Sequence, residues 1–266
     1  MLGCNSGARR ERDLAYFGTL TIRLPIFCWW LTVNLNSVDQ VMTDRHSVRA
    51  FSEKKPDVSL IRAILDAAAQ SPSGSNTQPW RVYVLQGQSL AELIRKVCLA
   101  HEQVRAQPEL AAGFRQLFHY YPKEWPSPYL ERRRDNGRGF YGVLGIARGD
   151  KEGMHQQDQR NYRFFDAPVG LIFTINKSLG QGSWIDYGIF LQSIMLSAKG
   201  HGLDTCVQAS WNGFANVVLP HIGAAECETV VCGMALGYAE EEAPINHFRT
   251  PRAPVDSWTT WLDDLA

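Results

Sequence analysis

The sequence predicts an α+β fold in which helices and strands share one core. Helical and strand-like segments are mixed, without the strict strand–helix–strand repeat of a parallel α/β sheet. Residues 168–175 are apolar on both faces, which is typical of a central strand covered by helices on both sides. A chain of 266 residues, 45% of them hydrophobic, can bury a sizeable core in one large domain or two small ones.

The first half of the chain is expected to contain three helices and one strand. Apolar side chains at helical spacing indicate the helices, and alternating side chains indicate the strand. In order, these elements are a short helix capped by Asn36 or Ser37, a helix capped by Asp57 or Ser59 and stopped by Pro72, a strand over residues 80–85 and a helix over residues 89–105.

The second half begins with an aromatic and proline-rich stretch of the kind that often forms binding or lid elements. Pro244, Pro251 and Pro254 then predict that residues from about 240 to 266 form an extended arm rather than a packed element. Between them we expect a helical segment over 129–146, the central strand at 168–175, a helix over 186–199, a short strand or turn at 203–210, a short helix at 216–222 and a buried strand over 229–236.

Residues 1–34 are predicted to be an N-terminal extension that precedes a single domain over residues 35–266. Three arginines precede an apolar run at residues 24–33, which resembles an export signal. That run is shorter than the roughly 20 residues of a transmembrane helix, and no small-x-small cleavage site follows it. An extension is therefore favoured over a functional signal.

Charge and cysteine usage exclude several classes of function. The formal net charge is zero, so we expect no nucleic acid and no membrane as a partner. None of the six cysteines forms a C-x-x-C pair, which argues against a metal site and favours reduced thiols in the cytoplasm. A Rossmann dinucleotide site is not supported either, because no G-x-G-x-x-G follows a strand.

Two stretches carry clusters of polar and charged side chains. Arg45, Ser47 and Arg49 stand at alternate positions, so an extended backbone would point them to one side, where they suit a phosphate. A solvated basic turn explains the same spacing. Residues 71–80 combine Ser73, Asn76 and other polar side chains with two prolines, and alone they could be a plain helix-to-strand turn.

Together, R-x-S-x-R-x-F at residues 45–51 and S-P-S-x-x-N-x-Q-P-W at 71–80 resemble the FMN-dependent nitroreductase family. Residues 202–210, 232–238 and 249–254 are similar to later motifs of that family. Residues 140–146 and 162–168 resemble its nitrobenzoate-reductase branch in particular. The resemblance covers about residues 36 to 258.

The resemblance implies a three-layer α-β-α sandwich that forms an intertwined homodimer through its C-terminal arm, with FMN bound between the subunits. It assigns Arg49 to the flavin ring near N1, and residues 208–210 to the ring face near N5. Ala209 and Ser210 stand where many members carry an acidic residue and glycine, and Val207 replaces a frequent proline. The implied FMN-binding residues are Arg45, His46, Ser47, Arg49, Pro72, Ser73, Asn76, Gln208, Ala209, Ser210, Arg249 and Arg252.

The implied activity is NAD(P)H-dependent reduction of nitroaromatic compounds. NADH or NADPH would deliver hydride to FMN, and a small aromatic acceptor would then take two electrons at the same place, in ping-pong fashion, giving nitroso and hydroxylamine products. No catalytic side chain is implied. Quinones, activated alkenes or halogenated aromatics are alternative acceptors, and a non-catalytic flavin-binding protein is an alternative function.

For two further groups of residues, the sequence allows either a role in substrate binding or a purely structural role. Phe140 and Tyr141 are candidates for the wall of the substrate site, or else ordinary core residues. The run Arg132-Arg133-Arg134 could attract a carboxylated aromatic compound, or it could be a solvated helix face.

Overall fold

The structure is a computed structural model that describes residues 35–114 and 118–262. Residues 37–266 form one compact unit, and the fold below is that of its described part. The extension predicted over residues 1–34 lies outside the described residues, so it and the domain boundary stay predictions. Among the helices that the structure describes, none is both long enough and apolar enough to cross a membrane.

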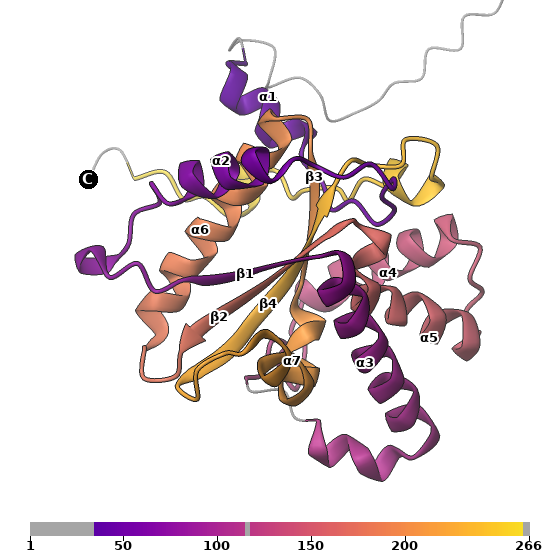
Figure 1. Cartoon of the computed structure of the whole chain (residues 1–266). Helices are drawn as coiled ribbons and strands as arrows, with labels where there is room; N and C mark the ends of the chain where they lie inside the picture. The colour runs from indigo at the N-terminus through magenta and orange to yellow at the C-terminus, as the bar shows by residue number, and fades with distance from the viewer. Residues whose placement is uncertain (1–34, 115–117, 263–266) are drawn as a thin grey trace, which may run out of the picture. The chain divides into compact units, whose positions relative to one another are not determined.

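A four-stranded antiparallel sheet forms the middle layer, with strand order β1-β2-β4-β3 (Figure 1). The central strand β4 is buried along its whole length, and β2 is buried up to its last residue. Both were expected as strands buried on two faces, and this is confirmed. The strands are β1 (Arg81–Gln86), β2 (Val169–Asn176), β3 (Asp204–Gln208) and β4 (Glu228–Gly237).

One face of the sheet is covered by α2 (Val58–Ala68) and α6 (Gln181–Gly200), and α1 (Ser37–Asp44) contacts α6. Tyr187 of α6 is almost fully buried, and its hydroxyl donates to the carbonyl oxygens of Arg81 (3.0 Å) and Thr174 (2.8 Å). This helix is therefore bonded to both β1 and β2.

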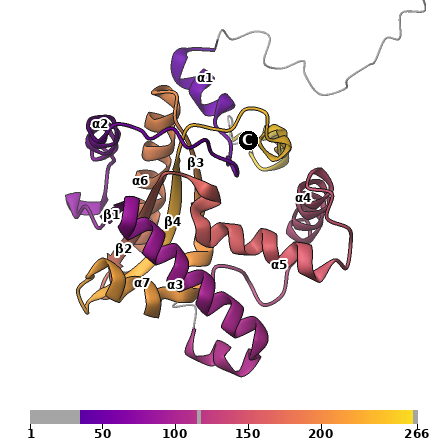
Figure 2. The same ribbon diagram turned by 45° about the vertical axis from the view of Figure 1, so that its right-hand side comes forward.

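The other face carries α3 (Gly87–Ala106), α7 (Ala215–Ile222) and two irregular turns, η4 (Arg160–Asp166) and η5 (Ala209–Phe214). Phe164 of η4 stacks on Trp211 of η5 with ring centroids 4.3 Å apart. The predicted three-layer arrangement is thus confirmed. Farther from the sheet on this side lie α4 (Tyr129–Val143) and α5 (Lys151–Gln159), as Figure 2 shows.

Two local expectations were wrong. The second helix ends at Ala68, before Pro72 is reached, and Ser71 Oγ donates to the Ala68 carbonyl at 2.7 Å. The tail was expected to be unpacked, but its first turn, η6 (Pro244–His247), buries Ile245 and Asn246. Proline interrupts helices and strands but does not prevent the residues beside it from being buried. The tail therefore packs where Ile245 and Asn246 follow Pro244.

Gly233 of β4 tests the packing between the sheet and η5. A Cβ there would lie 2.6 Å from Nε1 of the fully buried Trp211, whose own movement is blocked by Phe164. We predict that Gly233→Ala lowers the free energy of unfolding by about 1–3 kcal/mol, as overpacking of a dense core does. Urea denaturation measures this change.

The matched control for this prediction is Gly182→Ala in α6, where no atom lies within 4 Å of the added Cβ. It should leave the stability unchanged or raise it slightly, because alanine favours a helix. Equal stabilities of the two variants would contradict the packing argument.

Candidate functional site

Residues 45–51 run along the β3 edge of the sheet. Ser47 pairs with Thr205 of β3, and the Val48 amide donates to the Thr205 carbonyl at 3.1 Å. Farther on, Phe51 pairs with Ala239, just beyond β4. Val48 is fully buried, which fixes the orientation of the whole segment.

A pocket of about 430 Å³, here called the Arg45 pocket, is formed by this segment and the tail. Arg45, Ser47 and Arg49 all line it, and so does His46, which stands between them in the chain. The tail contributes Phe248, Arg249, Thr250 and Arg252. The structure therefore brings two basic motifs together that lie about two hundred residues apart in the chain.

The Arg45 pocket concentrates positive charge. In the described part of the chain, none of its four arginines has a carboxylate oxygen within 4 Å. Burial lowers the pKa of Arg45, and the nearby guanidinium of Arg252 lowers it further. Two guanidinium groups that repel each other at a pocket wall suit a bound anion, which would neutralise both.

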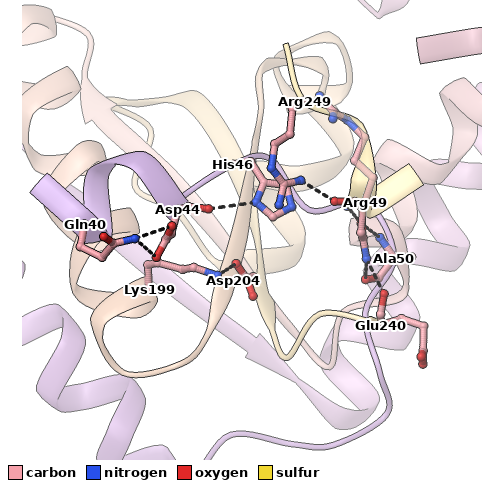
Figure 3. A network of polar contacts seen from close by, with 10 residues as sticks. Gln40, Asp44, His46, Arg49, Ala50, Lys199, Asp204, Glu240 and Arg249 are labelled. Atoms are coloured by element: carbon pink, nitrogen blue, oxygen red, sulfur yellow. Dashed lines mark hydrogen bonds and ion pairs between the residues drawn. The ribbon is translucent and has the colours of Figure 1, made fainter. Parts of the chain in front are cut away.

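His46 offers an unused polar atom to the same pocket (Figure 3). Its Nδ1 lies 3.2 Å from the Asp44 carbonyl oxygen, whereas its buried Nε2 has no partner among the described residues. Burial lowers the pKa of His46, and Arg249 contributes in the same direction against the effect of the Asp44 hydrogen bond. A neutral ring that donates through Nδ1 leaves Nε2 as an acceptor for a ligand hydroxyl.

Arg49 connects the Arg45 pocket to a second one. Its Nη1 donates to the Ser47 carbonyl at 3.2 Å, and its guanidinium lies 5.2 Å from the centroid of the Phe140 ring. The middle pocket, of about 200 Å³, is lined by Arg49, Phe140 and Tyr141, and by Asp158 and Asn161 on its far side. Both predicted substrate-wall residues therefore face a cavity next to Arg49.

A third pocket, of about 440 Å³, is lined by Gln208, Ala209 and Ser210 and is called the β3-end pocket. It shares Asp158 and Asn161 with the middle pocket, so the three pockets adjoin one another. Together they are called the groove.

The three residues that end β3 are not equivalent. Gln208 is buried and already engaged, since its Nε2 donates to the Asn161 carbonyl at 2.6 Å and its Oε1 lies 3.4 Å from Trp211 Nε1. Ser210 Oγ is buried without a partner in the described structure. Gln208 therefore shapes the wall, while the Ser210 hydroxyl remains available to a ligand.

Pro72, Ser73 and Asn76 lie far from the groove of their own chain. Their turn, η2 (Gly74–Asn76), precedes the edge strand β1, whereas Ser47 is bonded to β3 at the opposite edge. Figures 1 and 2 both show the turn on the far side of the sheet from β3. It rests on α6, where the Gly74 amide donates to Asp186 Oδ2 at 3.2 Å. Within one chain, the two predicted halves of the site, residues 45–51 and 71–80, therefore lie at opposite edges of the sheet.

The wall that α5 provides is held against α3. His155 Nε2 lies 2.8 Å from Glu102 Oε1, and His101 Nε2 lies 3.4 Å from Asp158 Oδ2. The two imidazole rings stack with centroids 4.4 Å apart. Although the sequence suggested no metal site, His101, Glu102 and His155 place three possible ligand atoms within 4.8 Å of one another. Their existing His–carboxylate contacts already explain this cluster as an anchor.

Asn246 is a residue that the sequence did not single out. Its Oδ1 accepts from the amides of Arg49 (2.9 Å) and Ala50 (3.2 Å), and its Nδ2 donates to the carbonyls of Ala50 (2.8 Å) and Glu240 (2.9 Å). The Asn246 carbonyl also accepts from Arg249 Nη1. One buried side chain therefore holds both walls of the Arg45 pocket in register.

We predict that Asn246→Ala lowers the melting temperature clearly, because four part-buried hydrogen bonds to the backbone are lost, each worth about 0.5–1.5 kcal/mol. Differential scanning calorimetry measures the change. Asn216→Ala is the control, since its exposed side chain makes a single bond, to the Gly113 carbonyl. A melting temperature equal to that of the control would contradict the anchoring role.

Comparison with known proteins places the chain in a family. The model of the nitroreductase family matches residues 42–238. The chain is 39% identical to a 4-nitrobenzoate reductase of Pseudomonas putida over 224 residues, which is 84% of this chain and 95% of that protein. It is 38% identical to a nitrobenzene nitroreductase of Ectopseudomonas oleovorans over 228 residues, covering 85% and 97%.

The solved structures agree. The FMN-dependent nitroreductase NfnB from Mycobacterium smegmatis, solved in complex with NADPH, superposes with a TM-score of 0.79 at 29% identity, covering 85% of this chain and 97% of that one. The residues matched by the family model include all four strands and the part of the groove that precedes the tail. The chain belongs to the nitroreductase family.

Proposed function

We propose that the chain is an FMN-dependent NAD(P)H oxidoreductase that reduces nitroaromatic compounds. One observation carries the proposal, namely the groove that begins with four arginines without a carboxylate partner in the described chain and ends at Ser210. FMN combines an anionic phosphate, a hydroxylated chain and a flat ring, and the groove offers partners in that order. Relatives that carry the names of nitroaromatic reductases support the same assignment.

The residues present fit FMN. Arg45, Arg249 and Arg252 would hold the phosphate, and an anion there relieves the mutual repulsion of Arg45 and Arg252. His46 Nε2 and Ser47 would serve the ribityl hydroxyls, which gives the buried imidazole nitrogen the partner it lacks among the described residues. Ser210 Oγ and the backbone after Gln208 would face the ring.

When bound, FMN supplies the hydride and two-electron chemistry that converts a nitro group to nitroso and hydroxylamine products. Arg49 provides a fixed positive charge at the junction of the Arg45 and middle pockets, and its contacts with the Ser47 carbonyl and the Phe140 ring restrict its movement. Such a preorganised cation favours negative charge that develops on reduction. Phe140 and Tyr141 would form the wall on which the aromatic acceptor packs.

We propose further that the protein is a homodimer in which Pro72, Ser73 and Asn76 of one subunit complete the groove of the other. Their position at the β1 edge leaves them unable to join Arg45 at the β3 edge of the same chain. Apolar side chains on α6, notably Ile185 (70% exposed), offer a surface for association.

We place the protein in the cytoplasm. Cys98, Cys206, Cys227 and Cys232 are free thiols, as in a reducing compartment. The cytoplasm also contains the NAD(P)H that the activity requires.

The function is tested with purified, FMN-loaded protein. We expect a yellow protein that bleaches when NADPH or NADH is added anaerobically and recovers its colour when 4-nitrobenzoate or nitrobenzene follows. Steady-state rates with a quinone run in parallel compare acceptor classes. A protein that takes up no FMN overturns the cofactor assignment, and a yellow protein that neither nucleotide bleaches overturns the enzyme assignment.

The shared site predicts complementation between subunits. Arg45→Ala and Asn76→Ala should each weaken FMN binding, for Arg45→Ala by about tenfold or more, because a charge-assisted bond contributes about 1.5–3 kcal/mol. In a heterodimer of the two variants, one groove carries both changes and the other carries neither. We expect that heterodimer, purified through two different tags, to bind one FMN per dimer with the affinity of the unchanged protein.

Fluorescence titration of FMN measures these affinities, and Arg62→Ala on the exposed surface of α2 is the control that should keep full affinity. A heterodimer without any site of unchanged affinity would mean that both halves of the groove come from one chain. That result would leave the flavin assignment intact and refute the shared site.

A further inference from the structure

A fourth pocket, called the α4 pocket, lies between α4 and α5 and is not used by the groove. Its volume is about 650 Å³, larger than any of the three groove pockets. Arg134 and Arg138 of α4 and Arg148 of the following loop line it, and no carboxylate side chain does. Tyr141 lines both this pocket and the middle pocket, so the two adjoin at its ring.

The cations of the α4 pocket differ in their partners. Arg138 forms an ion pair with Asp135, whereas Arg134 and Arg148 have no carboxylate oxygen within 4 Å in the described chain. The neighbouring Arg132 and Arg133 are outside the pocket, because their guanidinium groups lie over aromatic rings of Tyr129 (5.9 Å) and Trp125 (5.1 Å). The arginine run is therefore divided, and only Arg134 faces the cavity.

Two glycines of α4 provide an independent observation. Glycine destabilises a helix interior by about 1 kcal/mol relative to alanine, so its presence needs a reason. Gly139 has one, because a Cβ there would collide with the Phe248 ring. Gly137 and Gly142 line the α4 pocket, and no atom lies within 4 Å of a Cβ built on either. Because they lack side chains, these two glycines leave space in the pocket, and no close packing contact in the described chain requires a glycine at either position.

We propose that the α4 pocket binds the phosphorylated adenosine end of NADPH and makes the protein prefer NADPH to NADH. Arg134 and Arg148 hold the 2′-phosphate, and the adenosine lies on the floor formed by Gly137, Gly142 and Ile146. The nicotinamide end then reaches the groove past Tyr141. This inference rests on the proposed function, because it names the nucleotide that the same groove uses.

The size and charge of the pocket favour this occupant over the carboxylate of a nitrobenzoate. One carboxylate needs one guanidinium, whereas a nucleoside with a dianionic phosphate uses both free arginines and the apolar floor. Burial raises the pKa of Tyr141, and Asp158 adds to this effect. The Tyr141 hydroxyl therefore stays protonated and can donate to a phosphate of the nucleotide that extends past it.

The test compares Arg134→Gln, Arg148→Gln and the control Arg132→Gln in the FMN-loaded protein. We expect each of the first two to raise KM for NADPH by about tenfold or more with kcat unchanged, since each removes a charge-assisted phosphate contact. KM for NADH should stay within about twofold in all three variants, and Arg132→Gln should match the unchanged protein. Calorimetric titration should show the same loss of affinity for 2′,5′-ADP in the first two variants, whereas their affinity for 5′-AMP, which lacks the 2′-phosphate, should not change.

A second variant, Gly142→Leu, fills the floor without altering charge and should raise KM for both nucleotides. An unchanged ratio of KM for NADPH to KM for NADH in Arg134→Gln and Arg148→Gln would overturn the proposal. So would a rise in KM for 4-nitrobenzoate but not for nitrobenzene, which would assign the pocket to the acceptor. If the protein oxidises neither nucleotide, the proposed function fails, and binding of 2′,5′-ADP still decides whether the α4 pocket recognises this phosphate.

Discussion

Repulsion among the arginines of the Arg45 pocket is the constraint on which the site depends. Burial and the nearby Arg252 guanidinium lower the pKa of Arg45, and the described chain supplies no carboxylate oxygen within 4 Å of either guanidinium. Two like charges without a counter-charge tend to move apart unless the segments that carry them are held in place. Here the backbone is held by β3 on one side and by Asn246 on the other, so the charge stays concentrated for an anion to bind.

The same sheet fixes both ends of the groove. Ser47 is bonded to Thr205 near the start of β3, and Gln208 ends that strand opposite Gly233 of β4. Trp211 packs on Gly233 and so determines where the chain turns after Gln208. A ligand that uses both ends therefore meets a rigid span, which reduces the entropy lost on binding.

Local patterns predicted whatever depends on neighbours in sequence. Apolar runs correctly located β2 and β4. Arg45, Ser47 and Arg49 line one pocket, although His46, which alternation would point the other way, lines it too. The role of Asn246 could not be predicted, because its partner Arg49 is 197 residues away and an asparagine among prolines is typical of a turn. The resemblance paired the η2 motif with Arg45, but no local pattern shows that they lie at opposite edges of the sheet.

The arginine run on α4 shows why composition alone could not settle its role. Successive helical residues point about 100° apart, so three adjacent arginines must face three directions. Arg132 and Arg133 meet aromatic rings, whereas Arg134 meets a cavity that also contains Arg148. The run therefore combines two roles, and the direction in which each residue points from the helix decides its role. Arg132 and Arg133 lie on the outer face, whereas Arg134 belongs to the proposed anion site.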